Sequence, residues 1–252
     1  MTLSSSGQLN RDYFVDASLS LAPGASTVYQ LGLNLDIDAG PADVWSGGGL
    51  YPWMTAATSL EVVSASANDA AAGTGARTVT INGLNASYVE VAQIITMNGT
   101  TAVAIPTQLF RINSMTITTA GSGQVNDGNI TVRDAGAGTT RALMEAGYGA
   151  LRQSQFTVPA GKTLLVATAS HGINKPSSTR DATVAFYFRL SAGTYSLLFE
   201  IPVSSQPVFV PVFPIAAIPE KADIGYRVMY VSATNTIFTS AFFGLLTTNN
   251  ML

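Results

Sequence analysis

The clearest structural signal in the chain lies in Arg77-Thr-Val-Thr-Ile-Asn-Gly83, where polar and apolar residues alternate. Val79 and Ile81 fall on one side of an extended segment and threonines on the other, which is the period of two expected of a strand with one buried face. Asn82-Gly83 follows, a dipeptide that tolerates positive φ and often forms a hairpin turn. The stretch predicts a strand that ends in a turn.

The same pattern recurs along the chain, with turn signals at Asn98-Gly99, Asp127-Gly128 and Val158–Lys162. Apolar residues at helical spacing never continue beyond about two turns. About a dozen short strands without alternating helices predict an all-β, antiparallel β-sandwich, specifically a jelly roll, and the absence of an internal repeat counts against a propeller. The expected strands are Ser59–Ala65, Arg77–Asn82, Tyr88–Met97, Leu109–Thr119, Asn129–Arg133, Thr140–Glu145, Ser154–Val158, Thr163–Ala169, Ala182–Leu190, Tyr195–Ile201, Val208–Phe213, Gly225–Ser232 and Ile237–Leu245.

The first 43 residues have a different character. They mix Ser, Asp and Gly with short alternating pieces such as Val28–Leu35, and Gly40-Pro41 interrupts any strand. We expect residues 1–43 to form an extended N-terminal arm with one or two strands, loosely tied to the core. Residues 44–252 are then expected to form one jelly-roll-like β-sandwich domain.

Composition excludes several classes of function. The 252 residues include no cysteine, which removes disulfides, thiolate nucleophiles and Cys-ligated metals. Only 11% are charged, against about 25% in a typical domain. A net charge of −3 argues against a nucleic-acid partner, and no apolar run reaches the roughly 20 residues of a membrane span. The start of the chain lacks a secretory pattern. We expect a soluble protein whose weakly charged surface favours stable association.

No group of residues in the sequence forms a recognisable catalytic or cofactor site. His171 is the sole histidine, and without a Gly-x-Ser-x-Gly motif or neighbouring carboxylates it is best interpreted as a strand-end or loop residue. Glycoside hydrolysis needs two carboxylates at a suitable separation, and sequence alone does not show whether any two of the 15 acids meet. We expect no enzyme activity, no catalytic residues, no cofactor and no metal.

Three apolar features indicate contacts instead. Trp45, Tyr51 and Trp53 surround three consecutive glycines and are either core residues or an aromatic anchor at a subunit interface. Phe209 and Phe213 lie in the proline-interrupted strip 207–214, expected to be an edge strand that a neighbouring subunit covers. The segment 242–246 is either a final core strand or part of an oligomer seam. We therefore predict interface roles for Trp45, Tyr51, Trp53, Phe209 and Phe213.

A set of short motifs follows in a fixed order over residues 43–247. The motifs are Asp43-Val-Trp-Ser-Gly-Gly-Gly-Leu-Tyr-Pro-Trp53, residues 63–81, Met97-Asn-Gly-Thr-Thr101, Phe156-Thr-Val-Pro-Ala-Gly-Lys162, residues 218–224 and Phe242-Phe-Gly-Leu-Leu246. Together, in this order, they resemble a family of virion structural proteins of tailed bacteriophages, including phages of marine and freshwater bacteria. The resemblance implies a β-sandwich component of the particle, with no catalytic residues to transfer and no fixed position on head or tail.

These observations favour a capsid decoration (cement) protein that forms a homo-oligomer, expected to be a trimer, and binds the phage major capsid protein or other virion proteins. Its expected location is the capsid surface rather than the tail, after synthesis in the host cytoplasm. If residues 1–43 are an attachment arm, deletion of residues 2–42 weakens attachment and leaves the sandwich folded. The alternatives are a tail, fibre or baseplate module that binds host-surface glycan, with Tyr51, Trp53 or Tyr148 in a shallow groove, and a tail hydrolase with paired carboxylates.

Overall fold

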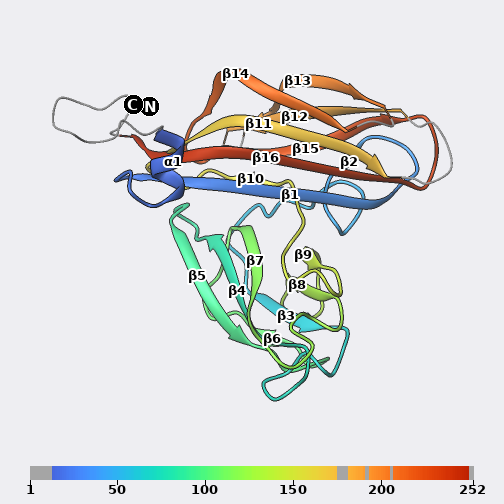
Figure 1. The fold of residues 1–252 in the computed structure, drawn as a ribbon. Helices are drawn as coiled ribbons and strands as arrows, with labels where there is room; N and C mark the ends of the chain where they lie inside the picture. The colour runs from blue at the N-terminus through green and yellow to red at the C-terminus, as the bar shows by residue number, and fades with distance from the viewer. Residues whose placement is uncertain (1–12, 175–180, 191–192, 205–206, 250–252) are drawn as a thin grey trace.

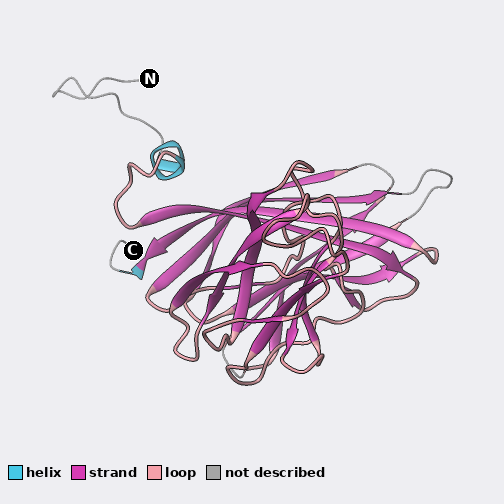
Figure 2. Cartoon of the chain, turned by 90° about the horizontal axis from the view of Figure 1, so that it is seen from below, coloured by secondary structure: helices cyan, strands magenta, loops and turns pink. Residues whose placement is uncertain are grey.

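The computed structural model describes residues 13–174, 181–190, 193–204 and 207–249 of the chain. It is all-β, with 57% of the residues in strands and antiparallel pairing throughout. Helix α1 (Tyr13–Ser18) has six residues and lies at one edge of the strand body (Figure 2). Within the described ranges, no helix is long and apolar enough to cross a bilayer.

Four sheets form two packs, one above the other in Figure 1. The upper pack, here called the terminal sandwich, is built from the two ends of the chain. Its first sheet has the order β1 (Ala25–Ile37), β16 (Thr236–Thr248), β11 (Lys162–Asn174), β14 (Val208–Ile218). Its second sheet has the order β10 (Phe156–Thr157), β15 (Asp223–Val231), β12 (Ala182–Arg189), β13 (Tyr195–Val203), with β2 (Ala42–Asp43) paired to β15.

The lower pack, here called the central sandwich, is formed by the chain between β2 and β10. Its third sheet has the order β6 (Val103–Ala104), β3 (Leu60–Ser64), β8 (Ile130–Asp134), β9 (Thr140–Met144). Its fourth sheet has the order β5 (Glu90–Thr96), β4 (Ala76–Leu84), β7 (Arg111–Ala120). A hydrophobic cluster that includes Val79, Met115 and Ile130 fills the space between them.

The two packs have separate cores. Phe186, Tyr226, Phe238 and Phe242 dominate the core of the terminal sandwich, and none of their side chains is more than 1% exposed. The central sandwich has its own cluster with no residue in common. The all-β, antiparallel prediction is therefore confirmed, whereas a single jelly roll over residues 44–252 does not describe the strand order. Local alternation reveals each strand but not which strands share a sheet.

The expected arm is also corrected by the structure. β1 pairs with β16 from Ala25 opposite Thr247 to Asn34 opposite Phe238, so residues 25–37 are an edge strand of the first sheet. β2 pairs with β15 in the second sheet. Residues 25–43 thus belong to the terminal sandwich, and the part of the proposed arm at residues 1–12 lies outside the described residues. The alternation of residues in Val28–Leu35 indicates this strand in the sequence. Its pairing partner, β16, follows about two hundred residues later in the chain.

The hairpin turn expected at Asn82-Gly83 is a strand position in the structure. β4 runs through both residues to Leu84, with a register shift against β7 between Asn82 and Gly83. A Cβ on Gly83 would lie 2.3 Å from the carbonyl oxygen of Arg111, so this glycine permits close backbone approach. By contrast, the turns at Gly99 and Gly161 have positive φ, as predicted.

Candidate interaction surfaces

The Trp45, Tyr51 and Trp53 cluster lies inside the chain. Trp45 is 4% and Tyr51 5% exposed, and the rings of Tyr51 and Trp53 meet edge to face at 4.8 Å between centroids. The Tyr51 hydroxyl donates to the carbonyl oxygen of Arg141, and burial raises the pKa of Tyr51 to about 12. The predicted interface role is therefore wrong for Trp45 and Tyr51. Gly48 and Gly49, at positive φ, let the loop fold the rings inward.

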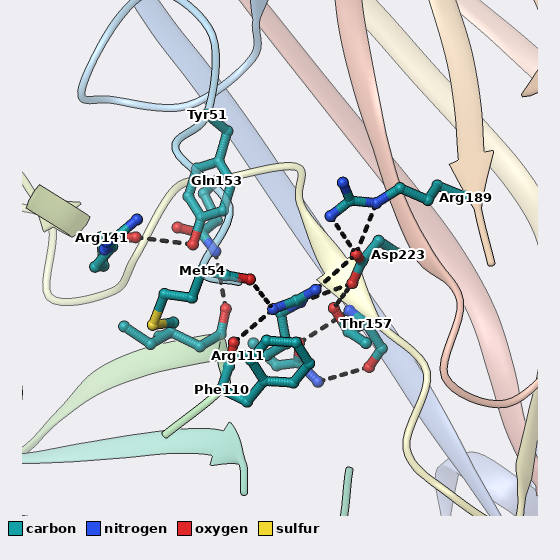
Figure 3. A network of polar contacts seen from close by, with 11 residues as sticks. Tyr51, Met54, Phe110, Arg111, Arg141, Gln153, Thr157, Arg189 and Asp223 are labelled. Carbon is teal, nitrogen blue, oxygen red and sulfur yellow. Dashed lines mark hydrogen bonds and ion pairs between the residues drawn. The ribbon is translucent and has the colours of Figure 1, made fainter. Parts of the chain in front are cut away.

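A buried ion pair joins the two sandwiches (Figure 3). Arg111, on β7 of the central sandwich, donates from Nε and Nη2 to the two carboxylate oxygens of Asp223 on β15, at 2.8 and 2.9 Å. Asp223 is 1% and Arg111 4% exposed. Arg189 of β12 donates to the same carboxylate at 2.6 Å, and the Thr157 hydroxyl donates to it at 2.6 Å. One buried carboxylate thus holds two guanidinium groups from different sheets.

Trp53 completes this junction. The guanidinium carbons of Arg111 and Arg189 lie 5.1 and 5.2 Å from the centroid of its rings. Nη1 of Arg111 donates to the backbone carbonyl oxygens of Met54 and Phe110, at 2.8 and 2.7 Å. The partly buried Trp53 is therefore a structural residue of the junction, since its ring packs against two cations that are already fixed.

The other buried carboxylates also have structural partners. Asp43 accepts hydrogen bonds from Arg227, Tyr187 and the backbone nitrogen of Tyr51. Asp69 accepts from the Ser64 hydroxyl and from the backbone nitrogens of residues 76, 127 and 128. Within the described residues, no group of three or more His, Asp or Glu side chains is arranged to hold a metal ion.

His171 lies in the interior of β11, not at a strand end or in a loop. Its side chain is 1% exposed and packs against the rings of Tyr226 and Phe238, with centroids 4.6 and 6.3 Å away. In the described part of the protein, neither ring nitrogen has a hydrogen-bond partner, and the same holds for the Tyr226 hydroxyl and Oγ of Ser240. Burial lowers the pKa of His171 from its usual 6.5 to about 4. A neutral histidine enclosed by aromatic rings is a core residue.

This burial predicts acid sensitivity. Above pH 6.5 His171 is neutral in the folded and unfolded states and contributes no pH dependence. Between pH 6.5 and about 4 the unfolded chain binds a proton that the folded chain does not, so the free energy of unfolding falls as the pH falls. The loss reaches about 3 kcal/mol near pH 4. Urea unfolding of the wild type and His171→Phe at pH 7, 5.5 and 4 measures it. Equal pH dependence in both proteins would contradict the assignment.

The outer face of the first sheet is apolar and largely uncovered. Phe209 on β14 is 77% exposed, Tyr29 on β1 53% and Phe243 on β16 44%. The rings of Tyr29 and Phe243 are 4.8 Å apart between centroids. Together with Thr168, Ser170 and Ala241, these three aromatic residues line a hollow of about 200 Å³. At one end of the same face, Ala17 of α1 and Ala22, which follows the helix, cover Leu245.

The predicted interface residue Phe209 is therefore on the surface, and β14 is the edge strand that the prolines predicted. The side chain of Phe213 lies outside the described residues. Tyr29 is not among the residues singled out from the sequence. The segment 242–246 is part of the last strand, β16, and Phe242 and Leu246 lie in the core while Phe243 is exposed. The signal was strand alternation: Phe242 points into the core at 1% exposure, so its neighbour Phe243 must point outward.

The outer face of the second sheet holds another pocket. Its volume is about 200 Å³, and Tyr187, Tyr195, Leu197, Arg227 and Met229 are among its lining residues. Leu197 is 58%, Met229 45% and Tyr195 38% exposed. The guanidinium carbon of Arg227 lies 5.3 Å from the ring centroid of Tyr195, and Glu200 supplies a carboxylate to the same pocket. The pocket combines apolar surface with charged groups.

A larger groove, of about 470 Å³, lies between the sandwiches. β1 and β5, the edge strands of the first and fourth sheets, contribute residues 26–30 and 90–92 to it. Asn82, Asn113 and Ser114 add polar side chains. Glu90, its one charged lining residue, pairs with Lys162 at 3.0 Å. The groove is thus lined by polar and apolar residues alike and is nearly neutral.

No protein-family model matches the chain, and no curated protein matches it in sequence. Among solved structures, the chain is weakly similar to a structure of the Gx strain of infectious bursal disease virus, with 10% sequence identity and a TM-score of 0.26. The match covers 95% of this chain and 79% of that chain. A mutant VP2 protein of the same virus, in derived T=1 particles, gives 9% identity, 89% and 78% coverage and a TM-score of 0.15. TM-scores this low support no inference about function.

Proposed function

We propose that the protein is a non-enzymatic structural component of a virion, specifically a capsid decoration (cement) protein of a tailed bacteriophage. The observation that carries the proposal is that the terminal sandwich exposes large apolar side chains on the outer faces of both its sheets. Tyr29, Phe209 and Phe243 lie on one face, and Tyr195, Leu197 and Met229 on the other. Such patches mark interaction sites on soluble proteins.

Two further observations favour assembly over catalysis. The buried carboxylates Asp43, Asp69 and Asp223 are bonded to arginines or to backbone nitrogens, which suits a rigid scaffold. The whole chain has only 27 charged residues beside 51 serines and threonines, so copies in a dense array repel one another weakly. Partners of this kind are copies of the chain itself and other virion proteins, and neither nucleic acid nor a membrane is required.

The proposed mechanism is thermodynamic. A protein that binds the assembled shell but not free coat subunits stabilises the shell by mass action. We assign the contact with the shell to the second-sheet face, in place of the N-terminal arm, because residues 25–43 are held in the terminal sandwich. Among the apolar residues that line the pocket on this face, Leu197 has the most exposed side chain.

Leu197→Asp is expected to weaken binding to purified shells by about tenfold or more, as for removal of an interface anchor. Leu197 is 58% exposed, so the substitution is expected to leave stability unchanged. Ile94→Asp is the matched control, because Ile94 is 66% exposed on β5 of the other sandwich. Co-sedimentation with shells lacking the protein measures binding. Equal binding by the wild type and Leu197→Asp would overturn this assignment.

The second candidate function is attachment to host-surface glycan by a tail, fibre or baseplate module. The pocket around Tyr195 favours it, since an exposed aromatic ring beside Glu200 and Arg227 offers stacking and hydrogen bonds to a sugar. We place the sugar at this pocket and not in the groove expected around Tyr51, Trp53 or Tyr148. Tyr51 is buried, Trp53 is partly buried in the junction, and the ring of Tyr148, which is 56% exposed, faces the guanidinium of Arg152. Binding to host-surface oligosaccharides that Tyr195→Ala abolishes would favour attachment over decoration.

A further inference from the structure

We propose that the outer face of the first sheet pairs with the same face of a second copy of this chain about a two-fold axis. The choice of a second copy as the partner rests on the proposed assembly role. The geometry of the pairing is argued from this face alone. The face is formed by alternate residues of β1, β16, β11 and β14. Its uncovered centre lies between Tyr29 on one edge strand and Phe209 on the other.

The face holds a projecting ring and a hollow on the same surface. Phe209, 77% exposed on edge strand β14, is its projecting ring. The hollow lies beside it, with Tyr29, Ala241 and Phe243 on its far side. In a two-fold arrangement each copy can place its Phe209 in the hollow of the other, because an isologous interface repeats every contact in both directions.

The register places these residues in adjacent rows. In the first row, Tyr29 is opposite Phe243, and Phe243 is opposite Thr168. In the next row, the order across the four strands is Leu31, Ala241, Ser170 and Phe209. Neighbouring strands are about 4.8 Å apart, so the two edge strands of the sheet are separated by roughly 14 Å. Thr168 and Ser170 on β11 lie between the projecting ring and Tyr29, close to the expected axis.

Charge and area both suit a second copy. The residues of these two rows carry no charge, so two identical faces approach without like-charge repulsion. Tyr29, Phe209 and Phe243 are 53, 77 and 44% exposed. At about 150–250 Å² per aromatic side chain, their exposed area is roughly 260–430 Å², a third to a half of the ~800 Å² that each partner buries in a standard interface. Leu31, 38% exposed, extends the same surface.

The chain itself covers one end of this face. Ala17 and Ala22 pack on Leu245, and Leu165 and Ala25 lie against the same cluster. The covered end shows that this sheet surface accepts apolar partners, and the uncovered rows continue directly from it along β16. Two sheet faces that stack in this way accommodate two copies, so the expected oligomer is a dimer in place of the trimer inferred from the sequence.

Sedimentation velocity over a range of concentrations tests the pairing with the full-length chain. We expect a reversible monomer–dimer equilibrium whose dissociation constant rises about 30-fold in Phe209→Ser, as for removal of a central aromatic anchor. Leu197→Ser, on the second-sheet face, is the matched control and is expected to dimerise as the wild type does. Thermal unfolding of both variants verifies that they fold. A wild-type monomer at every concentration, a trimer, or a dimer unaffected by Phe209→Ser would each overturn the proposal.

The absence of cysteine allows a second, positional readout. Thr168→Cys, near the expected axis, is expected to give a covalent dimer with a short bismaleimide, whereas Leu197→Cys remains a monomer. The reverse pattern would place the contact on the other face and overturn the proposal. None of these experiments uses particles, so a monomeric chain that still binds shells would refute the pairing and leave the proposed function intact.

Discussion

Deletion of residues 2–42 is expected to prevent folding. The deletion removes β1, whose Ile37 and Leu33 are 1 and 3% exposed and whose Val28 packs against the terminal core. It also removes Gln30, which donates from its side-chain amide to the backbone carbonyl oxygens of Asn113, Gln153 and Gln155. Without β1, β16 becomes an edge strand that is paired only with β11, and without Gln30 the buried carbonyl groups lose their donor.

Far-UV circular dichroism and urea unfolding of the truncated chain measure this effect. We expect no cooperative transition, in contrast to a chain that lacks only residues 2–12, in which every described contact is retained. A truncated protein with wild-type cooperativity would contradict the assignment of β1 to the core sheet. It would also restore the interpretation of residues 1–43 as a separable arm.

Asp223→Ala is expected to lower the free energy of unfolding by about 3–5 kcal/mol. The substitution leaves the guanidinium groups of Arg111 and Arg189 without their shared carboxylate, and the side chain of Arg111 is only 5% exposed. The Thr157 hydroxyl loses its acceptor in the same step. The cost is large because an unpaired charge in a buried position keeps the full penalty of desolvation.

Arg111→Met combined with Asp223→Leu provides the control. Removal of both partners leaves less uncompensated charge, so the double variant is expected to be more stable than Asp223→Ala. Urea unfolding followed by circular dichroism gives both values. A loss below about 1 kcal/mol in Asp223→Ala, the range of an exposed ion pair, would show that this junction does not hold the sandwiches together.

The sequence was most informative about individual strands. Alternation located each of the thirteen expected strands to within a few residues, since a period of two is a local property of a half-buried strand. The partner of β1 and the insertion of the central sandwich could not be predicted in this way. Both depend on pairing between segments far apart in the chain, which no local pattern encodes.

The candidate surfaces were predicted less completely. Phe209 was identified because prolines mark its strand as an edge, whereas Trp45 and Tyr51 were assigned to an interface although they are buried. Large aromatic residues serve cores and interfaces equally well, so residue type alone does not separate the two roles. Residues on opposite faces of one strand, such as Phe242 and Phe243, can be separated only when the inner face is known.

We propose that the protein is a virion component on the capsid surface. Immunogold electron microscopy of intact particles of the proposed phage tests this proposal most directly. Label spread evenly over the head is the predicted result. Label confined to the tail or fibre tips would contradict decoration and favour glycan attachment, and particles without any label would contradict a virion role altogether.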